Sequence, residues 1–331
     1  MGRKFHFFLF LVLTLSLLSL SVRAKNSPEM VSRMATTELF DTYWTDIFRL
    51  TLPWAESFFR IITELGSDYF YTMLIAIGFW TVDKRKSIRL TFVLVSSVVL
   101  NYWMKITFRN LRPPSANWLS GADVSNYSLP SGHAQNSVVL WGWLGIKIKK
   151  WWISFLFFGL ILLIGLSRIY LGVHWLGDVL AGWMVGLILL SAIWRLEKPV
   201  ESFLSRFNPN LSYLGLAIFG LVAMVLTELI SPVTIIGLET NFGVNGGMMI
   251  GLGIGLLLER RYVNFEAPGS KKAKWRIILR VIIGLVLVFG FTLGLSPILL
   301  TEVYWLRAIR YALVTIIVTF VWPFLFEKLN L

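Results

Sequence analysis

Basic, histidine and acidic residues occur at three places between Lys105 and Asp178 in a pattern that suits chemistry at phosphorus. In chain order they are Lys105 with Arg112-Pro113, then Pro130-Ser131-Gly132-His133, then Ser167-Arg168 with His174 and Asp178. Three cationic side chains, Lys105, Arg112 and Arg168, are enough to surround a tetrahedral oxyanion. Two histidines and one carboxylate supply a nucleophile, an acid–base group and an orienting partner. The sequence therefore predicts a site for phosphate transfer.

The spacing of His174 and Asp178 predicts a direct contact. Residues four apart lie on the same face of a helix. A carboxylate inside an apolar helix is energetically costly unless it has a partner, and His174 provides one. Of the three histidines in the chain, only His6 lies outside the motifs.

The three motifs resemble those of the type 2 phosphatidic acid phosphatase (PAP2) superfamily, which also includes soluble acid phosphatases and vanadium haloperoxidases. The resemblance extends from about Lys105 to Asp178. It implies an all-α polytopic membrane protein of the lipid phosphate phosphatase branch, with a six-helix-type catalytic core. The residues that it marks as catalytic are His174, His133 and Asp178. Those that it marks as binding the substrate phosphate are Lys105, Arg112, Ser131, Gly132 and Arg168.

The expected chemistry follows from these positions and agrees with the resemblance. His174 attacks phosphorus and forms a phosphohistidine, while Asp178 holds its other ring nitrogen. His133 protonates the leaving oxygen and then activates water. The backbone N–H groups of Ser131 and Gly132 are expected to add neutral donors at a helix start. Because three cations offset the phosphate charge, we expect neither a metal nor another cofactor.

Each motif residue also has a purely structural interpretation. Lys105, Arg109 and Arg112 could be interfacial anchors at the end of a helix, and Ser131 an ordinary N-cap. Gln135 and Asn136 could line the pocket or form hydrogen bonds between helices. The complete set of two histidines and an aspartate favours catalysis, because binding phosphate alone needs no nucleophile.

The composition places the chain in a membrane. Hydrophobic residues make up 56% of the 331 residues and charged residues only 15%, and the mean hydropathy is +0.71. A soluble domain of this size could not cover so much apolar material. The absence of cysteine excludes disulfides, thiolate metal sites and a cysteine nucleophile.

The net charge of +13 comes largely from four basic clusters between apolar segments. They contain Lys84, Arg85, Lys86 and Arg89; Lys147, Lys149 and Lys150; Arg195, Lys198 and Arg206; and Arg260, Arg261, Lys271, Lys272, Lys274 and Arg276. This pattern indicates cytoplasmic connections and attraction to anionic lipids rather than nucleic-acid binding. The motif-bearing connections 108–132 and 168–173 then face outward, as in an inner (cell) membrane enzyme whose site opens to the periplasm or cell exterior.

We expect four regions along the chain. Residues 1–24 resemble a cleavable signal peptide, or alternatively an uncleaved anchor helix. Residues 25–67 form an interfacial amphipathic segment of one or two helices, residues 68–196 the catalytic membrane domain, and residues 197–331 additional transmembrane helices. Nine apolar ranges approach the length of a span: 68–83, 89–107, 133–149, 151–167, 174–194, 212–231, 243–258, 276–297 and 303–325.

The function predicted from these features is hydrolysis of a lipid phosphate or diphosphate monoester. The partner is thus a lipid phosphate substrate in a membrane: a phosphatidate, phosphatidylglycerol phosphate, polyprenyl diphosphate or sphingoid base phosphate. A phosphotransferase with the same intermediate and a non-catalytic lipid- or phosphate-binding transporter are the alternatives. The glycines from Gly237 to Gly255 favour close helix packing. Arg307 and Arg310 could extend to the membrane surface or pair with Glu302.

Overall fold

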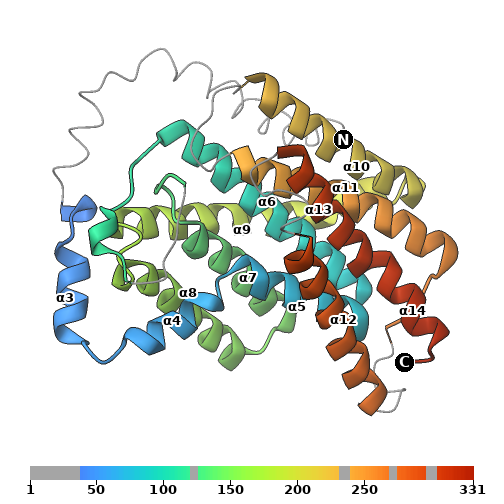
Figure 1. Ribbon diagram of the computed structural model, residues 1–331, viewed down its shortest axis with the longest axis horizontal. Helices are drawn as coiled ribbons and strands as arrows, with labels where there is room; N and C mark the ends of the chain where they lie inside the picture. Colours follow the sequence, from blue (N-terminus) through green and yellow to red (C-terminus); the bar gives the residue numbers. More distant parts are fainter. Residues whose placement is uncertain (1–37, 120–125, 231–238, 268–273, 296–303) are drawn as a thin grey trace. The chain divides into compact units, whose positions relative to one another are not determined.

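The regular structure of the chain is helical throughout the residues that the computed structural model describes (Figure 1). These are residues 38–119, 126–230, 239–267, 274–295 and 304–331. The expected all-α fold is confirmed. The expected signal segment 1–24, with His6, lies outside the described residues, and so does Glu302.

A helix coincides with each of the nine expected apolar ranges. In chain order the elements are η1 (Glu38–Phe40), α3 (Tyr43–Thr51), α4 (Glu56–Glu64), α5 (Asp68–Thr81), α6 (Lys84–Phe108), η2 (Ser115–Asn117), α7 (Gly132–Ile148), α8 (Trp151–Tyr170), α9 (Leu176–Leu204), α10 (Pro209–Ile230), α11 (Glu239–Tyr262), α12 (Lys274–Gly294), α13 (Tyr304–Ile316), the π-helical segment η3 (Ile317–Val321) and α14 (Trp322–Lys328).

Fewer helices than expected are long and apolar enough to cross a bilayer. Within the described residues five qualify: Lys84–Phe108, Trp151–Tyr170, Leu176–Leu204, Lys274–Gly294 and Trp305–Lys328. Two of the expected spans are short, because α5 has 14 residues and α7 has 17, whereas about 20 apolar residues cross the hydrocarbon core.

Several basic residues lie within helices rather than in connections. The helix α6 begins at Lys84, five residues before the expected start, so that the first basic cluster forms its first turns. The helix α9 continues through Arg195 and Lys198 to Leu204, with Pro199 inside it. Lysine and arginine are good helix formers, and their long side chains can reach the headgroup region from a helix end.

The chain divides into two compact units. The first unit contains residues 1–71 and 93–200, and the second contains residues 72–92 and 201–331. In the first unit α7 and α8 pack against each other, and α3 and α4 pack against α8 (Figure 1).

The helix α4 lies along the last turns of α8 and runs in the opposite direction. The rings of Phe59 and Tyr170 pack at a tilt with a centroid distance of 4.6 Å, Thr63 bonds to Arg168, and Gly66 faces Ile164. The two short helices α3 and α4 correspond to the expected amphipathic pair, but the sequence pattern did not indicate that α4 contacts the motif-bearing helix.

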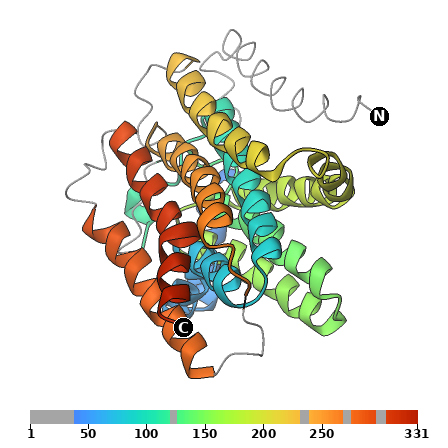
Figure 2. The ribbon, with the colours of Figure 1, turned by 90° about the vertical axis from the view of Figure 1, so that its right-hand side faces the viewer.

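In the second unit α11 packs between α10 and α13 (Figure 2). Its glycines allow close approach: a Cβ atom at Gly247 or Gly251 would lie 2.2 or 2.3 Å from a backbone oxygen of α13. This contact explains the glycine enrichment as helix packing.

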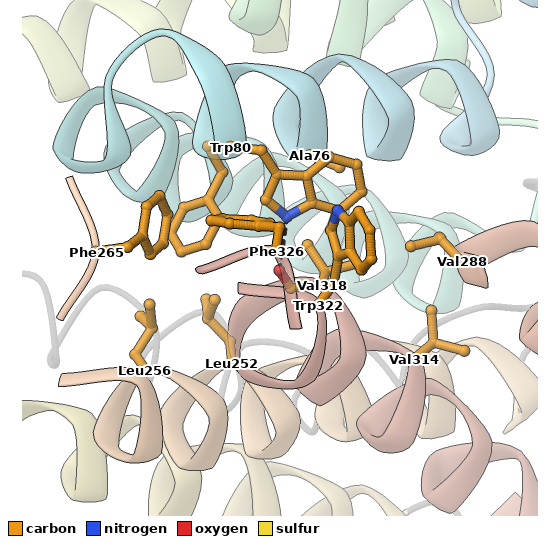
Figure 3. Packing of buried hydrophobic residues seen from close by; sticks show 11 residues of the cluster. Ala76, Trp80, Leu252, Leu256, Phe265, Val288, Val314, Val318, Trp322 and Phe326 are labelled. Atoms are coloured by element: carbon orange, nitrogen blue, oxygen red, sulfur yellow. Dashed lines mark hydrogen bonds between the residues drawn. The ribbon is translucent and has the colours of Figure 1, made fainter. Parts of the chain in front are cut away.

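An aromatic core joins α5, α11, α12, α13 and α14 in the second unit (Figure 3). Trp80, Trp322 and Phe326 are almost completely buried in it. The indole N–H of Trp80 donates to the carbonyl oxygen of Val318 at 2.8 Å, within the π-helical segment. The indole N–H of Trp322 donates to the carbonyl oxygen of Arg280 at 3.0 Å.

Candidate active site

The motif residues of the first unit lie at helix ends and in the connections next to them. Lys105 is in the last turn of α6, His133 is the second residue of α7, Arg168 is in the last turn of α8 and Asp178 is in the first turn of α9; Arg112 and His174 lie in connections. Arg112 contacts His174, which in turn contacts Asp178. The charges of Lys105 and Arg168 also act on His174, so these helix ends form one polar cluster.

The expected contact between His174 and Asp178 is present. The Nδ1 atom of His174 lies 3.1 Å from Oδ2 of Asp178, and both side chains are almost fully buried. The same Oδ2 accepts hydrogen bonds from the Trp175 backbone N–H at 2.9 Å and from the Ser128 hydroxyl. Because an ionised carboxylate only accepts, this contact places the ring proton on Nδ1 and leaves the lone pair on Nε2.

Arg112 contacts the other side of the His174 ring. Its Nη1 atom lies 2.9 Å from Nε2 of His174 and donates to the Val173 carbonyl oxygen at 2.8 Å. A guanidinium group can only donate, so Nε2 must be the acceptor. The contacts of Arg112 and Asp178 thus favour the same tautomer, in which Nε2 faces the cationic cluster.

A single side chain, Asn126, contacts two of the three cations. Its Oδ1 accepts from Nζ of Lys105 at 3.1 Å and also from Nη2 of Arg112. Its carbonyl oxygen accepts from Nε of Arg112 at 2.6 Å, and the next carbonyl, of Tyr127, accepts from Lys105. Neutral oxygen atoms therefore satisfy donors of both cations without neutralising their charge.

Arg168 is held from α4. Its Nη1 atom donates to Oγ1 of Thr63 at 2.7 Å, while its buried Nε has no hydrogen-bond partner. In the part of the chain that the structure describes, no ion pair joins Lys105, Arg112 or Arg168 to a carboxylate. Buried positive charge without a counterion is unfavourable, so the cluster is suited to bind an anion.

Burial and neighbouring charge set the protonation of the two groups in the connections. Burial lowers the pKa of His174 well below its ordinary 6.5, and the positive charges of Arg112, Lys105 and Arg168 lower it further. Burial lowers the pKa of Arg112 to about 10, against the opposing effect of Asp178. At neutral pH His174 is therefore uncharged, and Arg112 remains charged.

The start of α7 differs in one respect from the expectation. Ser131 occupies the N-cap position, but its side chain makes no capping bond. Its backbone N–H donates to the carbonyl oxygen of Asp178 at 3.0 Å and is not available to phosphate, which corrects the expected role of that group. Its hydroxyl oxygen is buried and has no hydrogen-bond partner, so the side chain, not the backbone, is the free donor.

Other polar residues of the motif region have structural roles. Gln135 and Asn136 are buried and bond to Asn101 and Ser97 of α6, so they join helices rather than line a pocket. The side chain of Arg109 is exposed. The Ser167 hydroxyl bonds to the Ile164 carbonyl oxygen of its own helix at 2.6 Å.

Three residues that contact the cluster, Thr63, Asn126 and Ser128, were not predicted from the sequence. Only Thr63 could have been suspected from the sequence. It follows Phe59 by four residues, which places a polar side chain on the apolar face of an amphipathic helix. Asn126 and Ser128 carry no such signal, because they lie outside any helix, in the connection between α6 and α7.

Comparison with protein families gives two matches on this chain. A model described as the PAP2 superfamily matches residues 86–200, and one described as the transmembrane extension of PAP2 superfamily phosphatases matches residues 244–331. The first match contains Lys105, Arg112, His133, Arg168, His174 and Asp178. The chain belongs to the PAP2 superfamily. It is a multi-pass integral membrane protein with a PAP2 core and a C-terminal extension.

Individual PAP2 proteins are similar over part of this chain. Sphingosine-1-phosphate phosphatase 1 of Mus musculus is 31% identical over 171 residues, which are 49% of this chain and 39% of the relative. Phosphatidylglycerophosphatase B of Bacillus subtilis is 28% identical over 166 residues, 46% of this chain and 79% of the relative. The undecaprenyl-diphosphatase of Sulfolobus acidocaldarius is 33% identical over 38% of this chain and 62% of its own. The chain spans about two fifths of the mouse and rat sphingosine-1-phosphate phosphatases that it matches.

A crystal structure of a transmembrane PAP2-type phosphatidylglycerolphosphate phosphatase from Bacillus subtilis aligns with 57% of this chain and 96% of its own, at a TM-score of 0.42 and 24% identity.

Proposed function

We propose that this PAP2 protein hydrolyses a lipid phosphate or diphosphate monoester through a phosphohistidine intermediate. The observation that carries the proposal is the placement of His174. Asp178 holds its Nδ1 atom at 3.1 Å, and Arg112 lies 2.9 Å from its Nε2 atom. A neutral imidazole whose lone pair points into a group of cations is a nucleophile directed at a bound phosphate.

In the first step, Nε2 of His174 donates its electron pair to phosphorus as the bond from phosphorus to the leaving oxygen breaks. Asp178 stabilises the imidazolium that forms. His133 gives its proton to the leaving oxygen, which departs as the lipid alcohol or as a lipid monophosphate. Lys105, Arg112, Arg168, Ser131 and Gly132 bind the phosphoryl oxygens.

In the second step, water attacks the phosphohistidine. His133, now neutral, accepts a proton from that water. The bond from phosphorus to Nε2 breaks, so that inorganic phosphate leaves and His174 returns to its neutral form. Three cationic side chains offset phosphoryl charge here, a task that magnesium performs in many phosphoryl-transfer enzymes, and we therefore propose catalysis without a metal.

The proposed substrates are lipids because the polar cluster belongs to a membrane protein. The three relatives described above are named for a sphingoid base phosphate, a glycerophospholipid phosphate and a polyprenyl diphosphate. The shared chemistry of these compounds is a terminal phosphate on a long apolar chain, and that class is the proposed substrate.

We propose that the cluster faces the outside of the cell. Lys147 lies in the last turn of α7 and forms an ion pair with Glu197 in the second half of α9, far from His133 and Asp178 at the starts of these helices. A 17-residue helix such as α7 is about 25 Å long. The basic connection after α7, with Lys149 and Lys150, would then lie near one surface of the membrane and the polar cluster near the other. Basic connections favour the cytoplasm, which supports an extracytoplasmic site.

Phosphate release from a panel of lipid phosphates, measured with purified protein in excess EDTA, tests the reaction. At least one lipid phosphate should be hydrolysed, and orthovanadate should inhibit by mimicking the five-coordinate phosphorus. Activity that disappeared with EDTA and returned with magnesium would contradict the metal-free proposal. Phosphate recovered on an added alcohol rather than in water would indicate a phosphotransferase.

Single cysteines test the orientation, because the chain has none of its own. Ser115 and Lys150 are exposed and lie beyond the ends of α6 and α7. Ser115→Cys should react with a membrane-impermeant thiol reagent in intact cells, and Lys150→Cys only after lysis. The reverse pattern would place the cluster on the cytoplasmic side.

A further inference from the structure

The end of α4 contacts the candidate active site from outside the three motifs. Thr63 lies in the last turn of α4, and Gly66 lies in the connection to α5. Both precede residue 86, where the PAP2 match begins. Arg168 bonds to Thr63, and the ring of His133 lies close enough to Gly66 to meet a Cβ atom added there.

The bond from Arg168 to Thr63 fixes the direction of a buried cation. The Nη1–Oγ1 distance is 2.7 Å, and each of the two residues is 7% exposed. An arginine recognises phosphate through a planar set of donors whose direction matters. A guanidinium group held on one edge by Thr63 has its remaining donors oriented before the substrate arrives, which reduces the entropy lost on binding.

Gly66 allows the chain to pass close to the ring of His133. A Cβ atom at this position would lie 3.1 Å from Cδ2 of His133 and 2.7 Å from Cγ2 of Ile164. The backbone conformation does not require glycine, because Gly66 is absent from the positive-φ residues of the described chain. Close approach is therefore the physical reason for glycine, and Ile164 is fully buried and cannot easily yield.

We propose that the Thr63–Gly66 segment is a positioning element of the active site. Thr63 orients Arg168 toward phosphate, and the surface at Gly66 sets the position of the His133 ring relative to the leaving oxygen. Neither residue reacts. This proposal depends on the proposed phosphatase chemistry, but it assigns roles to residues outside the motifs that carry that chemistry.

The role of Thr63 is tested by Thr63→Val, which keeps the shape and removes the hydroxyl. We expect KM and the orthovanadate inhibition constant each to rise about tenfold, since a hydrogen bond to a charged group is lost, with a smaller change in kcat. Thr63→Ser should restore both constants. Thr51→Val is the matched control, because the Thr51 hydroxyl bonds only to carbonyl oxygens of its own helix, α3.

The role of Gly66 is tested by Gly66→Ala on substrates with different leaving groups. A displaced His133 should lower kcat for an alkyl phosphate, whose leaving oxygen needs a proton. It should have little effect on an aryl phosphate with an acidic phenol, or on vanadate inhibition. The control is Gly159→Ala on α8, where an added Cβ atom meets nothing within 4 Å.

The outcomes separate this proposal from the proposed function. If the wild-type protein hydrolyses phosphates but Thr63→Val binds vanadate as tightly as wild type, Thr63 has no positioning role. An equal loss on both classes of leaving group in Gly66→Ala would reject the role of Gly66. If the wild-type protein hydrolyses no phosphate, the function is wrong. Stabilisation of the wild type and Thr63→Val by orthovanadate, measured as a shift in thermal unfolding, still tests whether Thr63 orients an anion-binding Arg168.

Discussion

Each unit of this protein buries arginine, and Arg280 and Arg168 have opposite surroundings. Arg280 of the second unit is fully buried and donates to the carbonyl oxygens of Trp80, at 3.0 Å, and of Leu331. Its guanidinium carbon lies 3.7 Å from the centroid of the Phe326 ring. Its Nη2 atom lies 3.6 Å from Oε1 of Glu327. Protein groups therefore supply both an anion and an aromatic face.

Arg168 of the first unit has a hydroxyl group as its side-chain partner and lies in a cluster with two other cations. No described carboxylate forms an ion pair with it. A buried arginine paired within the fold joins helices, whereas one left among cations is available to a ligand. The comparison indicates where this protein places its chemistry and where it places its packing.

The two interiors differ in the same way. The second unit is centred on the aromatic core of Trp80, Trp322 and Phe326 (Figure 3). Between α6 and α7 of the first unit, Asn101 donates to Gln135 at 2.9 Å and to the Pro130 carbonyl oxygen at 3.2 Å. A fully bonded polar network fixes one arrangement of the helices, and here it fixes the connection that precedes His133.

The largest expected effect is that of His174→Ala. Loss of the nucleophile should lower kcat by roughly 10⁴-fold or more, and no phosphoenzyme should form from ³²P-labelled substrate. The thermal unfolding transition should remain, since the second unit is unchanged. A labelled phosphohistidine in this variant would show that another residue is the nucleophile.

His133→Ala should have the next largest effect on the reaction. Without a proton donor, kcat should fall by roughly 10²-fold or more for alkyl phosphates, and much less for aryl phosphates with acidic leaving groups. Hydrolysis rates over a series of leaving groups measure this dependence. A uniform loss across the series would mean that His133 is not the general acid.

Arg280→Met should show the reverse behaviour and affect stability rather than chemistry. Removing the guanidinium leaves two carbonyl oxygens without their donor, and a buried polar group left unsatisfied costs about 2 kcal/mol, whereas the exposed Glu327 can be hydrated. We expect the free energy of unfolding in a denaturant titration to fall by about that amount, with kcat/KM of the folded protein unchanged. Arg276→Met is the control, because Arg276 is partly exposed on the same helix. A stable but inactive Arg280→Met protein would contradict the division of roles.

The smallest effect concerns pH. Burial and then Arg112 lower the pKa of His174, and protonation of His174 removes the nucleophile. The acidic limb of kcat/KM should therefore lie below pH 6.5, the ordinary value for histidine. In Arg112→Gln one source of positive charge is gone, so this limb should move toward neutral pH. A shift in the opposite direction would mean that His174 does not titrate in this limb.

Much of the arrangement follows from local rules that the sequence displays. The apolar ranges predicted helices, because helix geometry is fixed. The contact of His174 with Asp178 was predicted from helical spacing, but His174 lies in the connection before α9, so the contact also depends on the path of that connection. Helix boundaries were less predictable: α6 begins five residues earlier than expected, since lysine and arginine fit a helix as well as a connection.

The sequence by itself determined the all-α membrane fold, and it supplied the candidate residues for the proposed chemistry at phosphorus. The tertiary structure decided how they are held: Asn126 against Lys105 and Arg112, Thr63 against Arg168, and the N–H group of Ser131 against Asp178. These contacts join residues up to 105 positions apart. Helical periodicity relates only near neighbours, whereas long-range partners depend on how helices pack, and that is fixed by the fit of many side chains at once.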